Sequence, residues 1–591
     1  MTARPRTVSI VMATYNRCSM LEHILPSFFT QVYDASAYEV VLVIDGSTDG
    51  TLRLVSSLRP ACGFEVVVQE HAGPAVARNA GIAAAGGEVV VLMDDDIRAT
   101  PALVAEHAAA HAAGSVIRAQ GALFAAPESP PTLPAWSTRH WYERYDHALR
   151  TKSKSDPNWR PFLNANSSLP RAVLTELGGF DESIPFPRED FELALRVAAA
   201  GIPSIYRPRA LAFEVFAKSS QDFVRDAVGY GRAELAICRK HPAYRPESAL
   251  APADRPFRGP LRVALRRTVT RTSPGWTRLL TPPMRAAESL ATRPRARNAG
   301  MKMLSIQHRA VLLHSAAEAA ESAAGLHEEF DRWLPVLLYH RVAIGGGGLH
   351  PSLTVSPRTF ERQIRWLVGH GYTGISPSDW IDWRQGRGRL PAKPVLITFD
   401  DAYAELARHA LPVLQDAGFP SLVFAVTERL GTPNSWDPPP PRGALPRLMD
   451  GDEIAGWARR GVEFGAHSRT HRDLTTLSRG DLQAEVHGSR ADLEELVQQP
   501  VGCFAYPYGS HHAVSRELVS GSYSLAFTAS EGLNGLATAS HLQRRLSVSP
   551  TERLAELEWR LRFGRIPLSR LRAFRARAAN AAERARSGAS H

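Results

Sequence analysis

The sequence predicts an α/β protein made of two domains. Two stretches of the 591-residue chain, from residue 7 to about 240 and from 331 to 552, alternate short apolar runs with stretches of helical spacing. Strands that alternate with helices in this way favour parallel sheets covered by crossover helices. The length agrees, because a chain of this size exceeds what one hydrophobic core can serve.

The first stretch gives a regular order of strands and helices. We expect strands at 7–13, 38–46, 64–70 and 88–96, and helices at 19–31, 48–59 and 74–85. The apolar runs are short and rich in valine, which is typical of buried strands in a parallel sheet. This domain is therefore predicted to be a parallel sheet with helices on its faces.

The second stretch has the same rhythm but no obvious sequence repeat of the first. Strands are expected at 333–342, 393–401, 421–426, 461–468, 503–509 and 524–530. The helices between them are about 12 to 15 residues long, a spacing that favours a parallel (β/α) barrel.

The predicted domain map is 1–240, 241–330, 331–552 and 553–591. The second segment, rich in Pro and Arg and then in Ala, is predicted to be a linker with one or two amphipathic helices, and the last segment a basic tail. The formal net charge is +11, and eleven arginines but a single acid, Glu288, lie within 255–297. Such segments are either solvated or touch an anionic surface. Lipid headgroups fit better than nucleic acid, because no aromatic-interleaved basic module accompanies the charge.

The cysteines and the N-terminus indicate the cellular compartment. The four cysteines lie far apart and form no CxxC pair, which argues against a disulfide framework or a thiolate metal site and favours a reducing compartment. The first apolar run lacks a cleavage site and reads as a strand, and no run approaches the roughly 18 to 20 apolar residues of a membrane span. We expect a cytoplasmic protein, with peripheral membrane contact through its basic linker and tail.

Acidic residues follow the fourth predicted strand of the first domain. Asp94 and Asp96 lie two apart, so in a continuing strand they would face one hard cation, such as Mg²⁺ or Mn²⁺ on a diphosphate. Asp190, at the start of a later helix, could deprotonate an incoming hydroxyl. A solvated turn at 94–96 and charge compensation at the helix N-terminus are the alternatives.

Six motifs give the first domain a family resemblance. "SIVMATYNR", "VIDGSTDGT", "ARNAGI", "LMDDD", "LGGFDE" and "EDFELALR" stand in the order and spacing of family 2 glycosyltransferases of the GT-A fold, over roughly residues 7–240. The resemblance implies a Rossmann-like domain that takes a nucleotide-diphosphate sugar and transfers the sugar with inversion.

The resemblance also implies roles for single residues. Nucleotide-sugar binding is assigned to Thr14, Tyr15, Asp45, Arg78, Asn79, Asp94 and Asp96. Asp45 matches the acid near the nucleobase, Asp96 the metal ligand and Asp190 the catalytic base. The sequence departs from the family pattern at Ile44, which replaces the first aspartate of "DDGS", and at Glu214, near the place of a histidine that family members often carry.

In the second domain, two adjacent carboxylates end an apolar run. Asp400 and Asp401 follow "PVLITF", and further along "GAHSRTH" places His467 and His471 four residues apart. Two imidazoles at that spacing can share one face of a helical turn and one metal ion. An aspartate and two histidines leave positions open on Zn²⁺, which suits metal-assisted hydrolysis. The remaining aspartate can then accept a proton from water, which explains the adjacent pair.

These residues resemble the polysaccharide deacetylases of carbohydrate esterase family 4, the NodB-homology domain, over about 335–550. "TFDDAYAEL", "HSRTH" and "CFAYPYG" carry the resemblance. It implies that Asp400 is the general base and that Asp401, His467 and His471 hold the metal. Tyr506, Pro507, Tyr508 and Gly509 would line the acetate and oxyanion side. Ala402 replaces the usual glycine, with little expected effect on the loop if its φ is negative.

Two further residues complete the implied site. "LPVLLYHRV" resembles the branch that deacetylates poly-N-acetylglucosamine, which makes His340 the general acid for the leaving amine; a core histidine is the alternative. Arg545, in "QRRLSV", matches an arginine that orients the base; a neutral surface role is the alternative.

The sequence therefore predicts a bifunctional carbohydrate enzyme of the cell envelope. One domain would transfer a sugar, most simply from UDP-N-acetylglucosamine, to a glycan, glycolipid or metabolite acceptor. The other would remove an N-acetyl group with a zinc-type metal. The alternative is a deacetylase whose first domain binds nucleotide or sugar without catalysis. No nucleic acid is expected as a partner.

Overall fold

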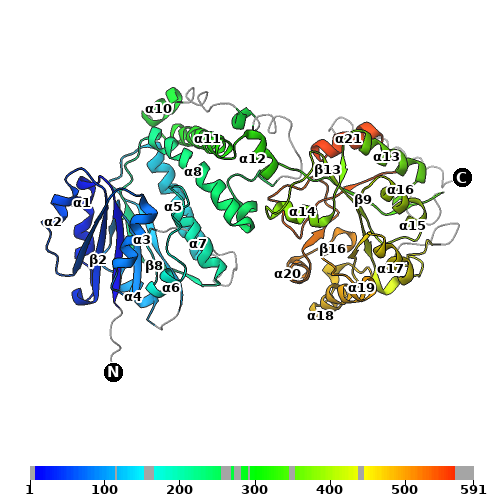
Figure 1. Ribbon diagram of the computed structural model, residues 1–591, viewed down its shortest axis with the longest axis horizontal. Helices are drawn as coiled ribbons and strands as arrows, with labels where there is room; N and C mark the ends of the chain where they lie inside the picture. Colours follow the sequence, from blue (N-terminus) through cyan, green and yellow to red (C-terminus); the bar gives the residue numbers. More distant parts are fainter. Residues whose placement is uncertain are drawn as a thin grey trace. The chain divides into compact units, whose positions relative to one another are not determined.

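The computed structural model describes residues 7–112, 116–151, 165–254, 266, 268–271, 281–289, 293–344, 353–436 and 445–565. The chain divides into two compact units, residues 1–241 with 269–323 and residues 242–268 with 324–591 (Figure 1). The segment predicted as a linker is thus shared between the units. Most of its arginine-rich part, and the tail beyond residue 565, lie outside the described residues.

The first unit is built on one eight-stranded sheet in the order β3-β2-β1-β4-β7-β6-β8-β5. Its strands are β1 (Val8–Thr14), β2 (Tyr38–Asp45), β3 (Gly63–Gln69), β4 (Val89–Asp94), β5 (Ile97–Ala99), β6 (Arg118–Ala125), β7 (Ser167–Pro170) and β8 (Ser204–Glu214). The first four are the predicted strands and run parallel. The expectation of a wholly parallel sheet is wrong, because β7 runs antiparallel to both of its neighbours. The strict strand–helix alternation ends at β4, and the later strands pair in both directions.

Helices cover both faces of this sheet. They are α1 (Cys18–Phe29), α2 (Thr51–Ser56), α3 (Pro74–Ala84), α4 (Leu103–Ala110), α5 (Leu133–Thr151), α6 (Arg171–Glu176), α7 (Glu189–Ala199), α8 (Ser220–Lys240), α10 (Thr281–Ser289) and α11 (Pro294–Ala319). Side chains of β1 alternate between two cores, since Ile10 packs with α1 on one face and Val11 packs with α3 and α6 on the other. The sheet is therefore buried on both faces, and its strand ends are left for ligands.

Helices α8 and α11 pack side by side through a glycine (Figure 1). A Cβ atom on Gly231 of α8 would lie 2.0 Å from the Ser315 hydroxyl oxygen and 2.2 Å from the Leu312 carbonyl oxygen of α11. We expect Gly231→Ala to lower the free energy of unfolding by about 1–3 kcal/mol, because the two helices must separate. Gly456→Ala, in a helix of the second unit where nothing lies within 4 Å of the added atom, should instead stabilise by up to ~1 kcal/mol. Urea denaturation of both variants measures the difference. A free energy of unfolding of Gly231→Ala equal to that of wild type would contradict the close packing.

The second unit is a curled parallel sheet that forms an open barrel. Its strands are β9 (Val336–Tyr339), β12 (Thr373–Gly374), β13 (Pro394–Phe399), β14 (Ser421–Ala425), β15 (Glu463–Ala466), β16 (Cys503–Ala505), β17 (Leu525–Phe527) and β18 (Leu546–Ser547). Their order is β17-β16-β15-β14-β13-β9-β18, with β12 beside β13. All of the predicted strands are present, and the parallel barrel expected from their spacing is confirmed. β10 (Arg341–Val342) and β11 (Thr354–Val355) pair separately.

Helices surround this sheet, and those other than α12 and α14 bury side chains in one continuous core (Figure 1). They are α12 (Ala323–Phe330), α13 (Pro357–Gly369), α14 (Pro377–Arg384), α15 (Leu406–His409), α16 (Leu411–Asp416), α17 (Gly451–Arg459), α18 (Arg479–Gln483), the π-helix η7 (Ala484–Gly488), α19 (Ser489–Val497), α20 (Ala513–Ser522) and α21 (Leu554–Phe563). Because all the strands are parallel, the loops at their carboxyl ends come together in one place.

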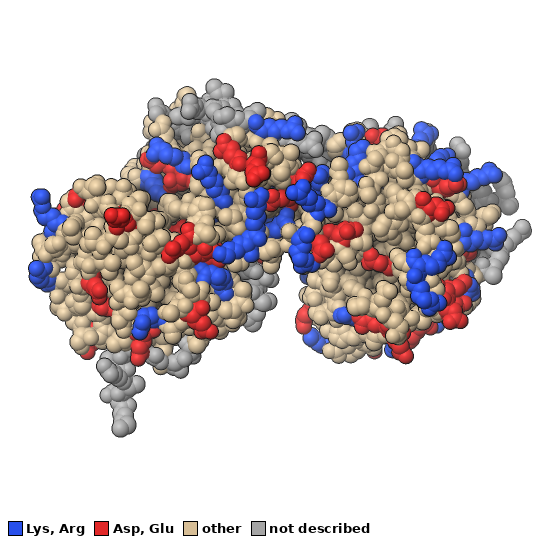
Figure 2. Space-filling model, viewed as in Figure 1, with Lys and Arg blue, Asp and Glu red and all other residues tan. Residues whose placement is uncertain are grey.

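Both units carry charges of both signs on the face drawn in Figure 2, where Lys and Arg side chains are interspersed with Asp and Glu. Among the helices that the structure describes, none has both the length and the apolar character to cross a membrane.

Candidate active sites

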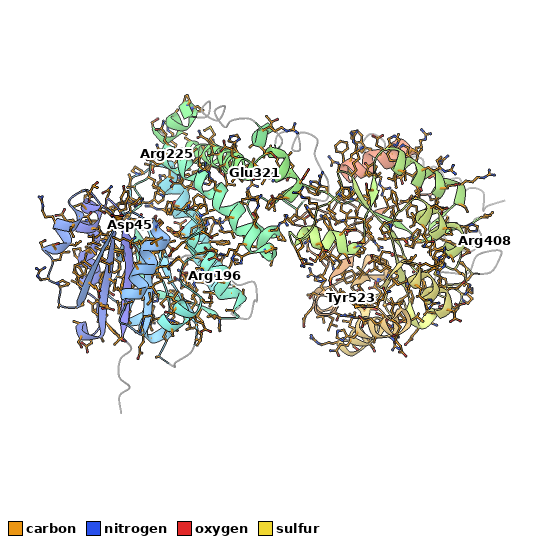
Figure 3. The ribbon with its side chains drawn as sticks, viewed as in Figure 1. Asp45, Arg196, Arg225, Glu321, Arg408 and Tyr523 are labelled. Carbon is orange, nitrogen blue, oxygen red and sulfur yellow. The ribbon has the colours of Figure 1, made fainter. Side chains whose placement is uncertain are left out.

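In the first unit, Asp45 ends β2 as a buried carboxylate. It accepts hydrogen bonds from the backbone N–H groups of Ala72 (2.9 Å) and Gly73 (3.0 Å) and from the side chain of Gln69 (2.8 Å). Gly73 has a φ of 96°, which favours glycine there. Figure 3 shows Asp45 at its strand end. The turn between β3 and α3 therefore fixes this carboxylate at the edge of the sheet.

An aromatic pair stands beside that carboxylate. The rings of Tyr15 and His71 stack with centroids 4.2 Å apart, and Nδ1 of His71 lies 3.0 Å from a carboxylate oxygen of Asp45. Tyr15 is 46% exposed, although it follows directly on a buried strand. An exposed ring above a fixed hydrogen-bond acceptor is suited to a flat, polar, aromatic ligand.

The acidic run after β4 does not continue the strand. β4 ends at Asp94 and a turn follows at Asp95, so the strand alternation that would make Asp94 and Asp96 face one way does not apply. Asp95 accepts a hydrogen bond from the Thr14 hydroxyl (2.7 Å). Burial, and then the charges of Glu214 and Asp95, raise the pKa of Asp96 well above its ordinary value. Several carboxylates thus crowd one strand end, an arrangement that a dication would relieve.

Arg78 holds two acids of this site together. Its guanidinium donates to Asp94 (2.8 Å) and to the buried carboxylate of Glu189. Burial alone would lower the pKa of Arg78, but the charges of Asp94 and Glu189 hold it above its usual range. This arginine remains a fixed cation between β4 and the start of α7.

Asp190 is the next residue of α7. Its carboxylate accepts a hydrogen bond from the backbone N–H of Phe191 (2.7 Å). Burial raises the pKa of Asp190, the charge of Asp94 adds to this, and Arg78 opposes it. A carboxylate with a raised pKa is a stronger base than an exposed one, which suits proton abstraction near neutral pH.

Asn79 connects two of the sequence motifs. Its side chain accepts from the backbone N–H of Phe180 (2.7 Å) and donates to the carbonyl of the same residue (2.9 Å) and to Glu182 (2.9 Å). The amide thereby ties the "ARNAGI" helix to the "LGGFDE" segment that leads to α7. Its assignment to nucleotide-sugar binding stays a prediction.

Glu214 ends β8 close to the acidic run. Tyr142 of α5 donates a hydrogen bond to its carboxylate, and burial raises the pKa of Glu214. The charge of Glu214 in turn raises the pKa of Asp96. Tyr142 was not expected in this site, because α5 carries no motif that would mark it.

In the second unit, Asp401, His467 and His471 form one buried group. Their ligand atoms all lie within 4.8 Å of one another, and the Nε2 atoms of His467 and His471 lie 3.7 and 3.5 Å from Oδ1 of Asp401. Burial lowers the pKa of His467, and burial followed by the nearby His467 lowers that of His471 to about 2. Both imidazoles are thus neutral. One carboxylate and two neutral imidazoles are the ligand set that Zn²⁺ or a similar metal accepts.

The spacing of the two histidines predicted a helical turn, but they do not lie on one. Residues 467–473 follow β15 as an irregular loop. Ser468 and His471 have φ values of 62° and 63°, so the chain turns back twice and brings both rings to one point. The carbonyl of Ala505 accepts from Nδ1 of His467 (2.8 Å), which leaves Nε2 of this ring for the group.

Asp400 has a different partner from its neighbour. Arg545, which is 1% exposed, donates to both of its carboxylate oxygens, at 2.6 and 2.8 Å. Burial alone would raise the pKa of Asp400, but Arg545 and then His467 lower it to about 2. The buried pair with Arg545 rules out the surface role considered for this arginine.

The backbone turns sharply directly after Asp400, at Asp401 and Ala402. Asp401 and Ala402 have φ values of 69° and 53°. The condition under which Ala402 was expected to have little effect on the loop, a negative φ, is therefore not met: an alanine here adopts the left-handed conformation that the usual glycine takes more easily. Ala402 is fully buried, and its carbonyl accepts from the N–H of Met449 (2.8 Å), so packing on this loop stabilises the conformation.

Aromatic rings enclose His471. Trp436 stacks on its imidazole at 4.3 Å, and Tyr508, 56% exposed with a φ of 58°, meets it edge-on at 4.7 Å. Tyr506 and Pro507, which precede Tyr508 in the chain, are buried. Trp436 was not expected in the site, because it lies in a segment without a recognisable motif.

His340 follows β9 at the same end of the barrel. After Arg545 and His467, its charge also contributes to the lowered pKa of Asp400, and after burial and His467 to that of His471. The backbone before it joins the site as well, since the carbonyl of Tyr339 accepts from the N–H of Asp400 (3.0 Å).

Comparison with protein-family models finds matches in both units. Residues 9–159 match glycosyl transferase family 2, and residues 89–230 match glycosyl transferase family group 2. Residues 387–522 match polysaccharide deacetylase. The matched ranges contain the acidic run of the first unit and the Asp401, His467 and His471 group of the second.

Individual proteins resemble one unit or the other. Validoxylamine A glucosyltransferase of Streptomyces hygroscopicus subsp. jinggangensis is 31% identical over 220 residues, 33% of this chain and 52% of that protein, so the chain spans about half of its length. Poly-beta-1,6-N-acetyl-D-glucosamine N-deacetylase of Staphylococcus epidermidis is 26% identical over 219 residues, 33% of this chain and 71% of that protein. The structure of mannosyltransferase PcManGT from Pyrobaculum calidifontis, in complex with GDP-Man and Mn²⁺, is 21% identical with a TM-score of 0.36, and covers 53% of this chain and 88% of that one.

Proposed function

We propose that this chain, which joins a family 2 glycosyltransferase domain to a polysaccharide deacetylase domain, adds an N-acetylhexosamine to an acceptor and then removes its acetyl group. The observation that carries the proposal is the buried group of Asp401, His467 and His471 beside the Asp400–Arg545 pair. Two linked sites would raise the effective concentration of the first product near the second.

For deacetylation, Asp401, His467 and His471 would hold Zn²⁺ or a similar metal. The metal would supply a Lewis acid for the amide carbonyl and lower the pKa of water. Asp400, kept anionic by Arg545, accepts the proton as water attacks. His340 donates a proton to the departing amine. The segment 506–509 lines the side on which acetate forms.

For transfer, the exposed ring of Tyr15 and the fixed carboxylate of Asp45 would bind the nucleobase. Asp96, together with Mg²⁺ or Mn²⁺, would hold the diphosphate, and Thr14 and Asp94 support that strand end. Asp190 accepts the proton of the acceptor hydroxyl. UDP-N-acetylglucosamine is the donor that fits both halves of the proposal, because its sugar carries the acetamido group that the second site needs.

A mass-resolved incubation tests the sequential reaction. The intact protein receives UDP-N-acetylglucosamine, Mn²⁺, Zn²⁺ and a lipid extract, alongside Asp96→Ala and Asp401→Ala. We expect a product that gains one N-acetylhexosamine and then exchanges its acetyl group for hydrogen, with each variant blocking its own step. Acetate release that is unaffected by Asp96→Ala, with no transfer product, would contradict the coupling.

A second candidate function is a deacetylase whose first domain binds nucleotide or sugar without catalysis. Glu214 favours it, because a carboxylate stands near the place where family members often carry a histidine, and Asp94 is already paired with Arg78. Donor hydrolysis or transfer by the intact chain separates the candidates, since a binding domain would give neither.

A basic face on α11 supports contact with a membrane surface. Arg295, Lys302 and Arg309 are exposed and recur at seven-residue intervals along one side of the helix, and no acid lies between Glu288 and Glu318. We expect replacement of all three by Glu to weaken binding to phosphatidylglycerol vesicles by about a hundredfold or more, since each basic residue near such a surface contributes about 1 kcal/mol. Co-sedimentation at low ionic strength measures the change.

The control for this experiment replaces three exposed arginines of the second unit by Glu. Arg358, Arg362 and Arg408 are exposed outside the basic face, and their replacement by Glu changes the net charge equally. Equal loss of binding in both triple variants would mean that net charge alone, rather than α11, determines vesicle binding.

A further inference from the structure

The histidine loop, residues 467–473, is followed by a helical segment that contains an unusual turn. Between α18 and α19 the chain forms the π-helix η7, in which one residue is accommodated beyond the regular α-helical repeat. Glu485 lies in this turn and is 5% exposed. Because π-helical turns are rare and often occur at functional sites, the direction in which this buried carboxylate points is informative.

Glu485 binds the backbone of the histidine loop. One carboxylate oxygen accepts from the N–H groups of Arg469 (2.8 Å) and Thr470 (3.0 Å), and the other accepts from the Thr470 hydroxyl. These two residues lie between His467 and His471. A single buried carboxylate thus satisfies consecutive donors of the loop that carries two of the three candidate metal ligands.

The opposite edge of the loop is held by backbone groups. The N–H of Thr427 donates to the carbonyl of Ser468 (3.3 Å), and the N–H of Glu428 donates to the carbonyl of Arg469 (2.9 Å). The loop is therefore fixed between the 3₁₀-helical turn η5 (Thr427–Arg429) on one side and Glu485 on the other. On the η5 side the contacts are made by backbone groups, whereas on the other side they are made by the side chain of Glu485.

His471 depends on its backbone for orientation. The Nδ1 atom of a metal-binding histidine usually donates to an acceptor that fixes the ring, as Ala505 does for His467. Nδ1 of His471 is buried and has no hydrogen-bond partner among the described atoms. Its ring is held by stacking on Trp436, and its backbone N–H by the Ser468 hydroxyl (3.0 Å). Movement of the loop would therefore move this ligand directly.

The π-turn itself is supported from α20. The Tyr523 hydroxyl donates to the carbonyl of Val486 (2.8 Å), and the Ser489 hydroxyl donates to the same oxygen (3.1 Å). Figure 3 labels Tyr523, which follows directly after α20. Two hydroxyl donors thus satisfy a backbone carbonyl of the turn and stabilise the geometry that directs Glu485 toward the loop.

We infer that Glu485 is a positioning residue for the metal centre, which acts by setting the backbone that aims His471. This inference rests on the proposed function, because it assumes that Asp401, His467 and His471 bind a metal. It assigns to the π-turn a purpose that a regular helix would not serve, since the additional residue changes which side chain faces the loop.

The test measures zinc affinity of the full-length metal-free protein by competition with a chromophoric chelator, together with its melting temperature. We expect Glu485→Gln to weaken zinc binding about 10- to 100-fold, as loss of other outer contacts of metal sites does. Thr470→Val, which removes only the hydroxyl contact, should fall between this variant and wild type.

Glu494→Gln is the matched control. Glu494 lies in α19 and also accepts from a backbone N–H, that of Val501 (2.9 Å); its other hydrogen-bond partner among the described residues is Arg490, outside the histidine loop. We expect its zinc affinity to stay within about twofold of wild type. If Glu485→Gln and Thr470→Val lower the melting temperature but leave zinc affinity unchanged, Glu485 is merely structural and the inference is wrong. If the wild-type protein binds neither Zn²⁺ nor Co²⁺, the metal centre itself is wrong and the inference falls with it.

Discussion

Asp401→Asn is expected to abolish zinc binding and deacetylation together, whereas Asp400→Asn should slow deacetylation strongly and leave zinc binding intact. Only Asp401 lies within the group formed with His467 and His471, and its loss removes the one anionic ligand. Asp400 is bound instead by Arg545 and is the group available to accept a proton. General bases contribute about 10²- to 10⁴-fold to rate, and we expect that loss in Asp400→Asn.

Zinc competition and acetate release, measured on the same preparations, distinguish the two roles. The control must address stability, because Asp400→Asn leaves Arg545 buried without its anion, which is costly. Circular dichroism and melting temperatures are therefore compared, and only variants that stay folded at the assay temperature are scored. Loss of zinc in Asp400→Asn but not in Asp401→Asn would reverse the assignment.

The grouping of Asp401, His467 and His471 could be predicted from the sequence, because these residues lie at strand ends. Asp400, Asp401 and His467 each directly follow a buried parallel strand, and apolar runs of that kind are read easily from sequence. The loop between the histidines is read less well. A spacing of four suits one helical turn, but it also suits an irregular loop with left-handed residues, and only the latter is present.

Residues that act from outside the motifs are not predictable in the same way. Glu485 lies in a segment that reads as one continuous helix from 479 to 497, and nothing in its pattern marks a π-turn. Trp436 reaches His471 through a loop pinned by Asn434, whose side chain donates to the Tyr403 hydroxyl (2.7 Å). Both contacts depend on the packing of distant segments rather than on local periodicity.

In the first unit, local pattern predicts the strands but not the ionic contacts. Asp94, Arg78 and Glu189 come from three separate motifs, and only the fold shows that the arginine lies between the two acids. The antiparallel strand β7 was missed for a related reason, since it is four residues long and its pairing depends on neighbours distant in sequence.

Asp190→Asn is expected to lower the turnover of sugar transfer by about 10²- to 10⁴-fold while leaving the KM for the donor nearly unchanged. The carboxylate is the proposed base, and Asp45, where we propose that the nucleobase binds, lies at a different strand end. Burial raises the pKa of Asp190, and a protonated carboxyl cannot accept a proton. Transfer should therefore fall as pH decreases through this raised pKa, at a higher pH than an exposed aspartate would give. Rates with and without Mn²⁺, measured across pH, provide the profile.

Glu192→Gln, on the same helix, separates catalysis from stability. Glu192 is buried and bound by Arg196 and His241, so its loss should destabilise the unit as much as the loss of Asp190 or more, without touching the acidic run. A variant that loses stability but keeps both transfer and the acid limb of its pH profile shows that α7 is intact as a scaffold. If Asp190→Asn instead raises the donor KM and leaves turnover unchanged, the carboxylate binds donor, and the base must be sought at Glu189. Glu189 is the other carboxylate at the start of α7, where Arg78 binds it.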